Sequence, residues 1–270
     1  MTARPFLKMH GLGNDFVVFD ARENPLAMTG PLARALADRH TGIGCDQLIL
    51  VERGSAPGAV RARFWNHDGS VSGACGNGSR AVASLVGGDM TIETDGGALA
   101  ASADGGGAVV DMGVPNFAWE SVPLAYAMDT ASLPLAWDEL ANPVAVSVGN
   151  PHAVFFVADP WVVPLETLGP VIENDTVFPE RVNVGVASLP SRDRMVLRVW
   201  ERGAGLTRAC GTGAVAAVAA AQRRGLADAR VKVSLPGGDL TIERRADGHL
   251  LMSGPATLAY SGMIDLDNFQ

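Results

Sequence analysis

The chain has 270 residues, 47% of them hydrophobic and 19% charged, and carries a formal net charge of -8 at pH 7. This length is sufficient for two domains with hydrophobic cores, and an acidic chain without a run of Lys and Arg is unsuited to nucleic-acid binding. No apolar run approaches the ~20 residues of a membrane span, the N-terminal residues lack the apolar core of a signal peptide, and three cysteines make no disulfide framework, so we expect a reduced, cytoplasmic protein.

The first half of the chain is predicted to alternate short strands with two helices. A helix is expected from Thr29, with Pro31 in its first turn, to about His40. A second helix is expected directly after Cys75. Apolar runs and period-two alternation predict strands at residues 5–9, 15–20, 47–52, 60–64 and 90–113.

The second half repeats this mixture after residues 115–143, which contain four prolines and show weak periodicity, and which we interpret as a linker. A helix is expected from Cys210 to about Arg224, ended by Gly225. Because Ala214 to Ala221 is apolar on every side, this helix should be enclosed by sheet. Together the elements predict an α+β fold, with further strands at residues 144–148, 153–158, 181–187, 195–201 and 226–260.

Two cysteines stand at the starts of the expected small-residue helices. Cys75 precedes Gly-Asn-Gly-Ser, and Cys210 precedes Gly-Thr-Gly-Ala. Unpaired N–H groups and the positive end of the helix dipole stabilise a thiolate at such a position. The simpler reading is a buried packing residue, which we adopt for Cys45 because no glycine-rich helix start follows it.

An internal repeat favours the catalytic reading of both cysteines. They are 135 positions apart, and the same shift places Phe64-Trp65-Asn66 on Val199-Trp200-Glu201. Glycines align readily by chance in a chain rich in Gly and Ala, but the polar matches recur in the same order, which favours duplication. Two similar domains would then each bring one cysteine-bearing helix to a shared cleft. A shift of 136 aligns Gly13-Asn14 with Gly149-Asn150 and Gln47 with Asn183.

Two facing thiols suit the inversion of a stereocentre that carries an acidic hydrogen. A thiolate removes the proton from one face while a thiol delivers a proton to the other, and the roles exchange in the reverse direction. N–H groups at the two helix starts would stabilise the developing negative charge. Neither pyridoxal phosphate nor a metal is required. A thiol redox protein with a reversible Cys75–Cys210 disulfide and a non-catalytic binding module remain alternatives.

The chain resembles the diaminopimelate epimerase family through motifs that span nearly its whole length in the family's order. Jointly they are highly specific, although one motif alone would be weak because related racemases carry something similar. The chain departs from the family in a short 85–91 connection and in Glu243-Arg244, neither of which touches the expected chemistry. The matching motifs are Met9-His10-Gly11-Leu12-Gly13-Asn14-Asp15-Phe16, Gly42-Ile43-Gly44-Cys45-Asp46-Gln47, Asn66 with Asp68-Gly69-Ser70, Ala74-Cys75-Gly76-Asn77-Gly78, Gly149-Asn150-Pro151-His152, and Glu201-Arg202-Gly203 with Ala209-Cys210-Gly211-Thr212-Gly213.

The resemblance implies two pseudo-symmetric α+β domains, each a barrel-like, mostly antiparallel sheet around a central helix. We expect one domain at residues 1–115 with the returning tail 256–270, and the other at 116–255. The substrate would lie between them, with closure around it. The implied activity is that of an isomerase without cofactor, interconverting LL- and meso-diaminopimelate in lysine and peptidoglycan precursor biosynthesis. A homodimer is the expected assembly, and a proline or hydroxyproline racemase is the alternative activity.

The resemblance also assigns the site residues. Cys75 and Cys210 are the acid/base pair. By the family's convention Cys75 is the proton donor and Cys210 the proton acceptor, and these roles exchange with the direction of the reaction. His152 and Glu201 are expected beside the reacting centre. Arg202 is expected on the distal carboxylate of the substrate. The remaining substrate-binding residues are Asn14, Gln47, Asn66, Asn150 and Asn183, with Gly76, Asn77, Gly211 and Thr212 on the reacting carboxylate; Glu201 belongs to both groups.

Overall fold

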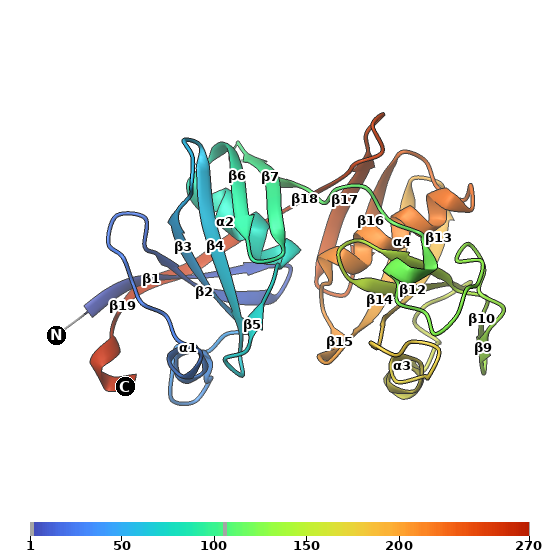
Figure 1. The fold of residues 1–270 in the computed structure, drawn as a ribbon, viewed down its shortest axis with the longest axis horizontal. Helices are drawn as coiled ribbons and strands as arrows, with labels where there is room; N and C mark the ends of the chain where they lie inside the picture. The colour runs from blue at the N-terminus through green and yellow to red at the C-terminus, as the bar shows by residue number, and fades with distance from the viewer. Residues whose placement is uncertain (1–2, 105–106, 270) are drawn as a thin grey trace. The chain divides into compact units, whose positions relative to one another are not determined.

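In the computed structural model, which describes residues 3–104 and 107–269, the chain divides into two units (Figure 1). The first comprises Met1–Asp111 with Gly254–Gln270, and the second comprises Met112–Ser253. The C-terminal segment therefore returns to the first unit, where its strand pairs with the N-terminal strand of the chain.

The first unit is a mixed sheet in the order β19-β1-β2-β3-β4-β6-β7-β8. The β2–β3 and β4–β6 pairs are parallel and the other pairs are antiparallel, with β5 added to β4 as a short hairpin. A 3-10 helix, Leu266–Phe269, follows the last strand. The elements are β1 (Ala3–Gly11), β2 (Asn14–Asp20), α1 (Gly30–Ala37), β3 (Gln47–Arg53), β4 (Ala59–Asn66), β5 (Val71–Ser72), α2 (Gly76–Val86), β6 (Gly88–Thr94), β7 (Gly97–Ala103), β8 (Ala108–Asp111) and β19 (Thr257–Asp265).

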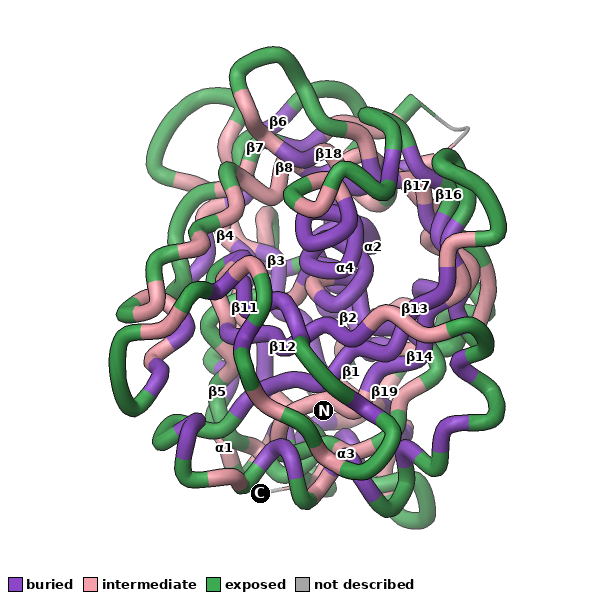
Figure 2. The backbone as a smooth tube through the Cα atoms, turned by 90° about the vertical axis from the view of Figure 1, so that its right-hand side faces the viewer, coloured by how far each residue is buried: buried purple, intermediate pink, exposed green. Residues whose placement is uncertain are grey.

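Helix α2 is enclosed by this sheet and packs against β1, β4, β6, β7 and β8. Every residue from Gly76 to Ala83 is buried, as the purple tube of this helix shows (Figure 2). Small residues make this approach possible: a Cβ on Gly78 would lie only 2.7 Å from Phe64 Cε1. Apolar residues on the other face of the sheet form a second cluster with helix α1.

The second unit has a sheet in the order β11-β12-β13-β14-β16-β17-β18, with β15 paired to β14. The β12–β13 and β14–β16 pairs are parallel and the others antiparallel. A 3-10 helix covers Trp119–Ser121. The elements are β9 (Ala136–Trp137), β10 (Leu140–Ala141), β11 (Val144–Ser147), β12 (Pro151–Phe156), α3 (Leu165–Glu173), β13 (Asn183–Ser191), β14 (Arg194–Glu201), β15 (Gly205–Thr207), α4 (Gly211–Arg223), β16 (Arg230–Leu235), β17 (Gly238–Arg244) and β18 (Leu250–Gly254).

Helix α4 occupies the position in this unit that α2 occupies in the first. It packs against β11, β12, β13, β14 and β17, and all residues from Ala214 to Ala221 are buried. The prediction of an enclosed helix is therefore confirmed. The helix ends beside Gly225, whose φ of 68° is a left-handed conformation that glycine adopts without strain.

The two units share one order of elements, which supports the internal repeat. Both units contain, in this order, two antiparallel strands, a helix, a hairpin, a short strand, the enclosed helix and three further strands. The registers also correspond: Phe16 pairs with Gln47 across the parallel β2–β3 pair, and His152 pairs with Asn183 across β12–β13.

Two expectations about local structure were wrong, and one helix was missed. Residues 115–143 are not a linker, because Leu133 and Leu140 are fully buried in the core of the second unit. Helix α3 was not anticipated, since Pro170 lies inside it and Pro164 precedes it. Helix α1 ends at Ala37 instead of near His40, because Asp38 turns the chain by accepting hydrogen bonds from the next residues.

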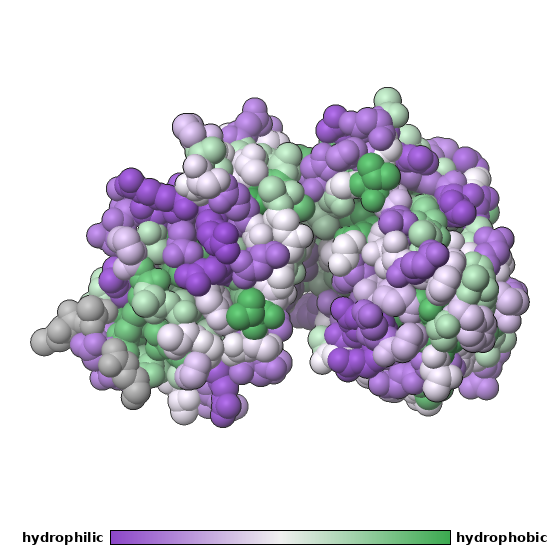
Figure 3. All heavy atoms as spheres, viewed as in Figure 1, coloured by the Kyte–Doolittle hydropathy of each residue, from purple (hydrophilic) through white to green (hydrophobic). Residues whose placement is uncertain are grey.

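The surface is a mixture of polar and apolar residues on the face of each unit that Figure 3 presents. Among the described residues, no helix combines the length and the apolar character needed to cross a lipid bilayer.

Candidate active site

The Cys75 thiol lies at the N-terminus of α2, as the sequence predicts. Cys75 is the N-cap residue, in an extended conformation with φ -145° and ψ 112°. Its Sγ accepts a hydrogen bond from the backbone N–H of Gly78 at 3.3 Å. The sulfur therefore takes the place of a capping oxygen at the positive end of the helix dipole.

Four amide side chains that are predicted to bind substrate lie in this unit, and they form two hydrogen-bonded pairs. Asn77 Nδ2 donates to Asn14 Oδ1 at 3.1 Å, and Gln47 Nε2 donates to Asn66 Oδ1 at 2.9 Å. The latter residues face each other in the β3–β4 register. Within the described residues, Gln47 Oε1 is a buried acceptor with no hydrogen-bond partner in the protein.

Asp46 orients the Asn14 amide, and the sequence analysis did not single it out. Its Oδ2 accepts from Asn14 Nδ2 at 3.0 Å, and its Oδ1 from Arg39 at 2.7 Å. Because the Asn14 nitrogen is directed at Asp46, the Asn14 oxygen is left to accept from Asn77. The position of Asp46 directly before Gln47 in a family motif was the available signal.

The second cysteine has the same backbone geometry in the second unit. Cys210 is the N-cap of α4, with φ -119° and ψ 107°, and its Sγ accepts from Gly213 N at 3.3 Å. The Thr212 hydroxyl lies 3.6 Å from the sulfur. Burial, then the charge of Glu201, raises the pKa of Cys210 well above its usual value, against the lowering effect of Thr212 and Gly213.

His152 is fully buried and joins Cys210 through a chain of hydrogen bonds. Its Nε2 lies 3.0 Å from Asn150 Oδ1, and Asn150 Nδ2 donates to Thr212 Oγ1 at 3.3 Å. The amide oxygen only accepts, so Nε2 carries the proton and the buried Nδ1 is an acceptor. Burial, then the charge of Arg202, lowers the pKa of His152 to about 3, which keeps the ring neutral.

The loop that carries Arg202 is held by two buried side chains. Asn183 Oδ1 accepts from Arg202 N at 3.0 Å, while its Nδ2 donates to Pro151 O at 2.7 Å. Glu173 on α3 accepts from Gly203 N at 2.9 Å. Glu173 was missed because its helix was missed.

The third cysteine has the structural role that the sequence predicts. Cys45 is buried in the apolar cluster beside α1. Burial is the main cause that raises its pKa to about 11, so it remains a thiol at neutral pH.

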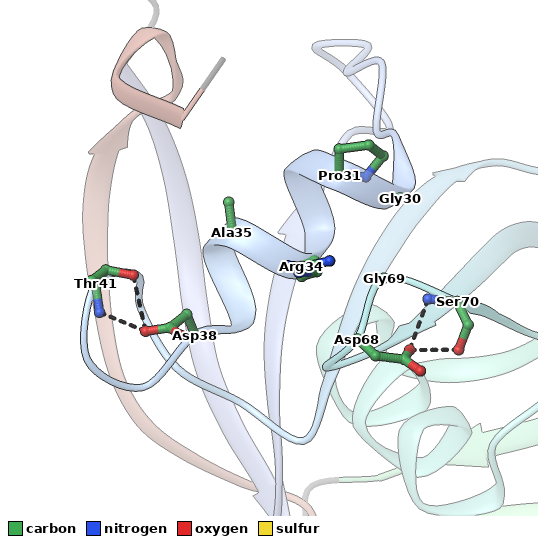
Figure 4. Close-up of a pocket in the computed structure, with 9 residues that line it drawn as sticks. All are labelled: Gly30, Pro31, Arg34, Ala35, Asp38, Thr41, Asp68, Gly69 and Ser70. Carbon is green, nitrogen blue, oxygen red and sulfur yellow. Dashed lines mark hydrogen bonds between the residues drawn. The ribbon is translucent and has the colours of Figure 1, made fainter.

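Two neighbouring cavities open on the first unit between α1 and the turn after β4, and Figure 4 shows the larger, about 660 Å³. Asp68 accepts from the Ser70 hydroxyl at its edge. None of the predicted site residues lines either cavity. The larger cavity is lined by Gly30, Pro31, Arg34, Ala35, Asp38, Thr41, Asp68, Gly69 and Ser70.

Each unit thus contains one capping thiol and its own share of the predicted residues. The first contains Asn14, Gln47, Asn66, Cys75, Gly76 and Asn77. The second contains Asn150, His152, Asn183, Glu201, Arg202, Cys210, Gly211 and Thr212. A thiol on a helix N-terminus, with amide side chains beside it, is suited to taking or giving a proton near an anion.

Known proteins with this fold include isomerases of amino acids. A probable proline racemase from Agrobacterium radiobacter, solved with bound carbonate, superposes with a TM-score of 0.71 at 15% identity, covering 99% of this chain and 94% of its own. A phenazine biosynthesis protein of the PhzF family from Bacillus anthracis gives 0.71 at 16% identity, covering 98% and 100%. At these identities the likeness establishes the α+β fold, as expected.

Closer relatives decide the family. The model of the diaminopimelate epimerase family matches residues 6–118 and 144–259. The diaminopimelate epimerase of Erythrobacter litoralis is 58% identical over 265 residues, and that of Zymomonas mobilis 51% over 264 residues, each covering 98% of both chains. These matches confirm the expected epimerase, an isomerase, over the proline racemase alternative: the chain belongs to the diaminopimelate epimerase family.

Proposed function

We propose that the protein interconverts LL- and meso-diaminopimelate by proton transfer between two thiols. The observation that carries the proposal is the duplicated thiol: Cys75 and Cys210 each cap a buried helix and each accept a backbone N–H at 3.3 Å. The reaction belongs to the biosynthesis of lysine and of peptidoglycan precursors.

In each turnover one sulfur gains a proton and the other loses one. The thiolate takes the α-proton, and the thiol of the other cysteine gives its proton to the opposite face of the same carbon. Charge that develops on the α-carboxylate is stabilised by the first-turn N–H groups of α2 and α4. The mechanism requires both thiols to reach one carbon of the substrate.

The polar side chains around each thiol would hold the rest of the substrate. The buried Gln47 Oε1 is an acceptor suited to an ammonium group. Arg202 is suited to bidentate binding of the distal carboxylate, and Asn183 fixes its backbone. The proton chemistry needs no pyridoxal phosphate, because the thiols supply the acid and the base and the helix termini supply the anion site.

The proposal extends to the assembly of the protein and to its location in the cell. We propose a cytoplasmic homodimer formed through the first unit, where β19 exposes Leu258, Tyr260 and Met263, each at least half exposed. Replacing Tyr260 with Asp should convert the dimer to a monomer in sedimentation experiments. A wild-type protein that sediments as a monomer would contradict this assembly.

The activity is tested by incubating the protein with LL-diaminopimelate in heavy water. We expect meso product with deuterium at the α-carbon, and at least a thousandfold loss of turnover in Cys75→Ser and Cys210→Ser. Cys45→Ser is the matched control and should keep its activity. No deuterium and no meso product in the wild type would refute the proposal, and turnover of proline instead would favour the racemase alternative.

A further inference from the structure

A chain of hydrogen bonds runs from the exposed end of α1 to the first turn of α2. Arg39 lies just after α1, and its side chain is 54% exposed. Its guanidinium donates to both oxygens of Asp15, at 3.0 and 2.7 Å, and to Asp46 Oδ1 at 2.7 Å. Asp46 Oδ2 accepts from Asn14 Nδ2 at 3.0 Å, and Asn14 Oδ1 accepts from Asn77 Nδ2 at 3.1 Å. An exposed arginine is thus joined to two amides that are predicted to bind substrate.

The two carboxylates of this chain need a cation between them. The same guanidinium nitrogen, Nη2, donates to Asp15 and to Asp46, so the carboxylates meet at one atom. Burial opposes ionisation of Asp15, but hydrogen bonds from Arg39 and Lys8 hold its pKa well below the usual range. Neighbouring anionic carboxylates repel each other. Lys8 donates to Asp15 at 2.5 Å and to the Gly44 carbonyl, whereas Arg39 bridges both carboxylates.

The backbone around Asp46 is held by other contacts. The N–H groups of residues 43 and 44 donate to Leu36 O at 2.9 and 3.1 Å, and that of residue 45 donates to Ala37 O at 3.1 Å. The Asp46 N–H donates to the Asp15 carbonyl at 3.1 Å. Loss of the Arg39 guanidinium should therefore release the two carboxylate side chains while the loop and its helix keep their fold.

The direction of the Asn14 amide depends on the Asp46 carboxylate staying in place. An ionised carboxylate only accepts hydrogen bonds, so it attracts the Asn14 nitrogen and turns the Asn14 oxygen toward Asn77. A flipped Asn14 amide would set its oxygen against Asp46 and its nitrogen against the Asn77 nitrogen. Asn77 is buried in the first turn of α2, two residues after the capping Cys75. The orientation of Asp46 is therefore transmitted to the start of this helix.

We propose that Arg39 positions Asn14 and Asn77 for the substrate by clamping the carboxylates of Asp15 and Asp46. Arg39 is a positioning residue that acts through Asp46. The inference rests on the proposed function in one respect, the role of the two amides in binding substrate. Because the clamp orients binding groups and leaves both thiols in place, its loss should raise KM and leave kcat nearly unchanged.

The first test compares two arginines of the same unit in the epimerase assay. Arg39→Met removes the guanidinium and keeps an apolar stem, and it should raise KM for LL-diaminopimelate at least about threefold. Arg53→Met is the matched control, because Arg53 is 70% exposed and donates to both oxygens of Glu23 at 2.8 and 2.7 Å. It should leave KM unchanged. A wild-type KM in Arg39→Met, or the same rise in both variants, would overturn the inference.

A double-mutant cycle tests whether Arg39 acts through Asp46. Asp46→Asn removes the carboxylate that links Arg39 to Asn14, so Arg39→Met should have little further effect on KM in that background. A general loss of stability would instead add to the effect of Asp46→Asn. A full rise of KM on adding Arg39→Met to Asp46→Asn would contradict the proposed route.

The last measurement uses the protein without substrate, by NMR of its side-chain amide groups. Arg39→Met should shift the signals of Asn14 and Asn77. It should leave those of Gln47 and Asn66, which are paired with each other at 2.9 Å in the same unit. If Arg39→Met does not fold, Arg39→Gln keeps a polar side chain and serves in the same assays.

The NMR result separates this inference from the proposed function. Unchanged Asn14 and Asn77 signals in the variant would overturn the inference, even in an enzyme that is active. Shifted signals in a protein whose wild type does not convert LL-diaminopimelate would refute the proposed function and leave the clamp standing.

Discussion

Replacing Gly78 with Ala tests why glycine follows each of the two cysteines. Gly78 lies in the first turn of α2, where the helix meets the sheet. A Cβ at this position would lie 2.7 Å from Phe64 Cε1 and 3.2 Å from Ile49 Cδ1. Both neighbours are fully buried, so the methyl group would enter a core that has no space for it.

Two opposing contributions set the size of the effect. Alanine is favoured over glycine inside a helix by up to about 1 kcal/mol. Against this, carbon atoms in contact are normally about 3.5–4.0 Å apart, so the Phe64 ring or the helix must move by about 1 Å. Overpacking of this kind typically costs about 1–3 kcal/mol. We therefore expect Gly78→Ala to lower the free energy of unfolding by about 1–2 kcal/mol.

The assay is urea unfolding of the two proteins, followed by far-UV circular dichroism. Ser79→Ala is the matched control, since its buried hydroxyl has no hydrogen-bond partner in the described part of the chain, and its removal should be neutral or stabilising. A Gly78→Ala variant as stable as wild type, or more stable, would refute the reasoning. The role of Gly78 would then be only to leave the backbone N–H groups near Cys75 uncovered.

Three further predictions concern side chains that support the site. The pKa of His152 falls from about 6.5 to about 3 on folding, so between these pH values the unfolded state binds a proton that the folded state does not. The free energy of unfolding should therefore fall by about 1.4 kcal/mol per pH unit from pH 6 to 4, relative to that of His152→Gln. If urea unfolding gives the same pH dependence for both proteins, the prediction is contradicted. Glu173→Gln sets an amide nitrogen against one of the two N–H donors of its carboxylate, Gly203 N or Trp200 Nε1, and should cost about 1–3 kcal/mol, measured by urea unfolding. Asp46→Asn loosens the orientation of Asn14 and should raise KM at least several-fold with little change in thermal midpoint; an unchanged KM would show that Asn14 is oriented by other contacts.

The parts of the fold that the sequence predicts are those encoded by local pattern. Ala214 to Ala221 is apolar on all sides, and a helix with that pattern has to be surrounded. Cys75 and Cys210 precede glycines and small helix formers, which locates both helix starts to the residue. The repeat then carries the arrangement of one half over to the other.

The missed parts depend on contacts between residues distant in the chain. The prolines of residues 115–143 indicate irregular structure, but they do not reveal that Leu133 and Leu140 are fully buried in the core of the second unit. Helix α3 contains Pro170 and begins after a proline, so packing of its apolar face against β13 and β14 outweighs its poor local propensity. Arg80 has an ordinary surface residue type, and only the fold shows that it is buried.

A duplicated site has a difficulty that the differences between the halves can resolve. Racemisation by two thiols needs one thiolate and one thiol, but two identical, independent thiols are singly ionised in at most about half of the molecules at any pH. Separating their affinities for the proton makes the singly ionised form dominant over a range of pH. The backbone around Cys75 and Cys210 retains the symmetry of the repeat, because each sulfur accepts a hydrogen bond from a helix N–H at 3.3 Å. The surroundings of Cys210 are nevertheless particular to its own half, since burial and then the charge of Glu201 raise its pKa well above the usual value. On this reasoning, the two halves can keep the same backbone geometry at the thiol while the surroundings of each thiol set its own affinity for the proton.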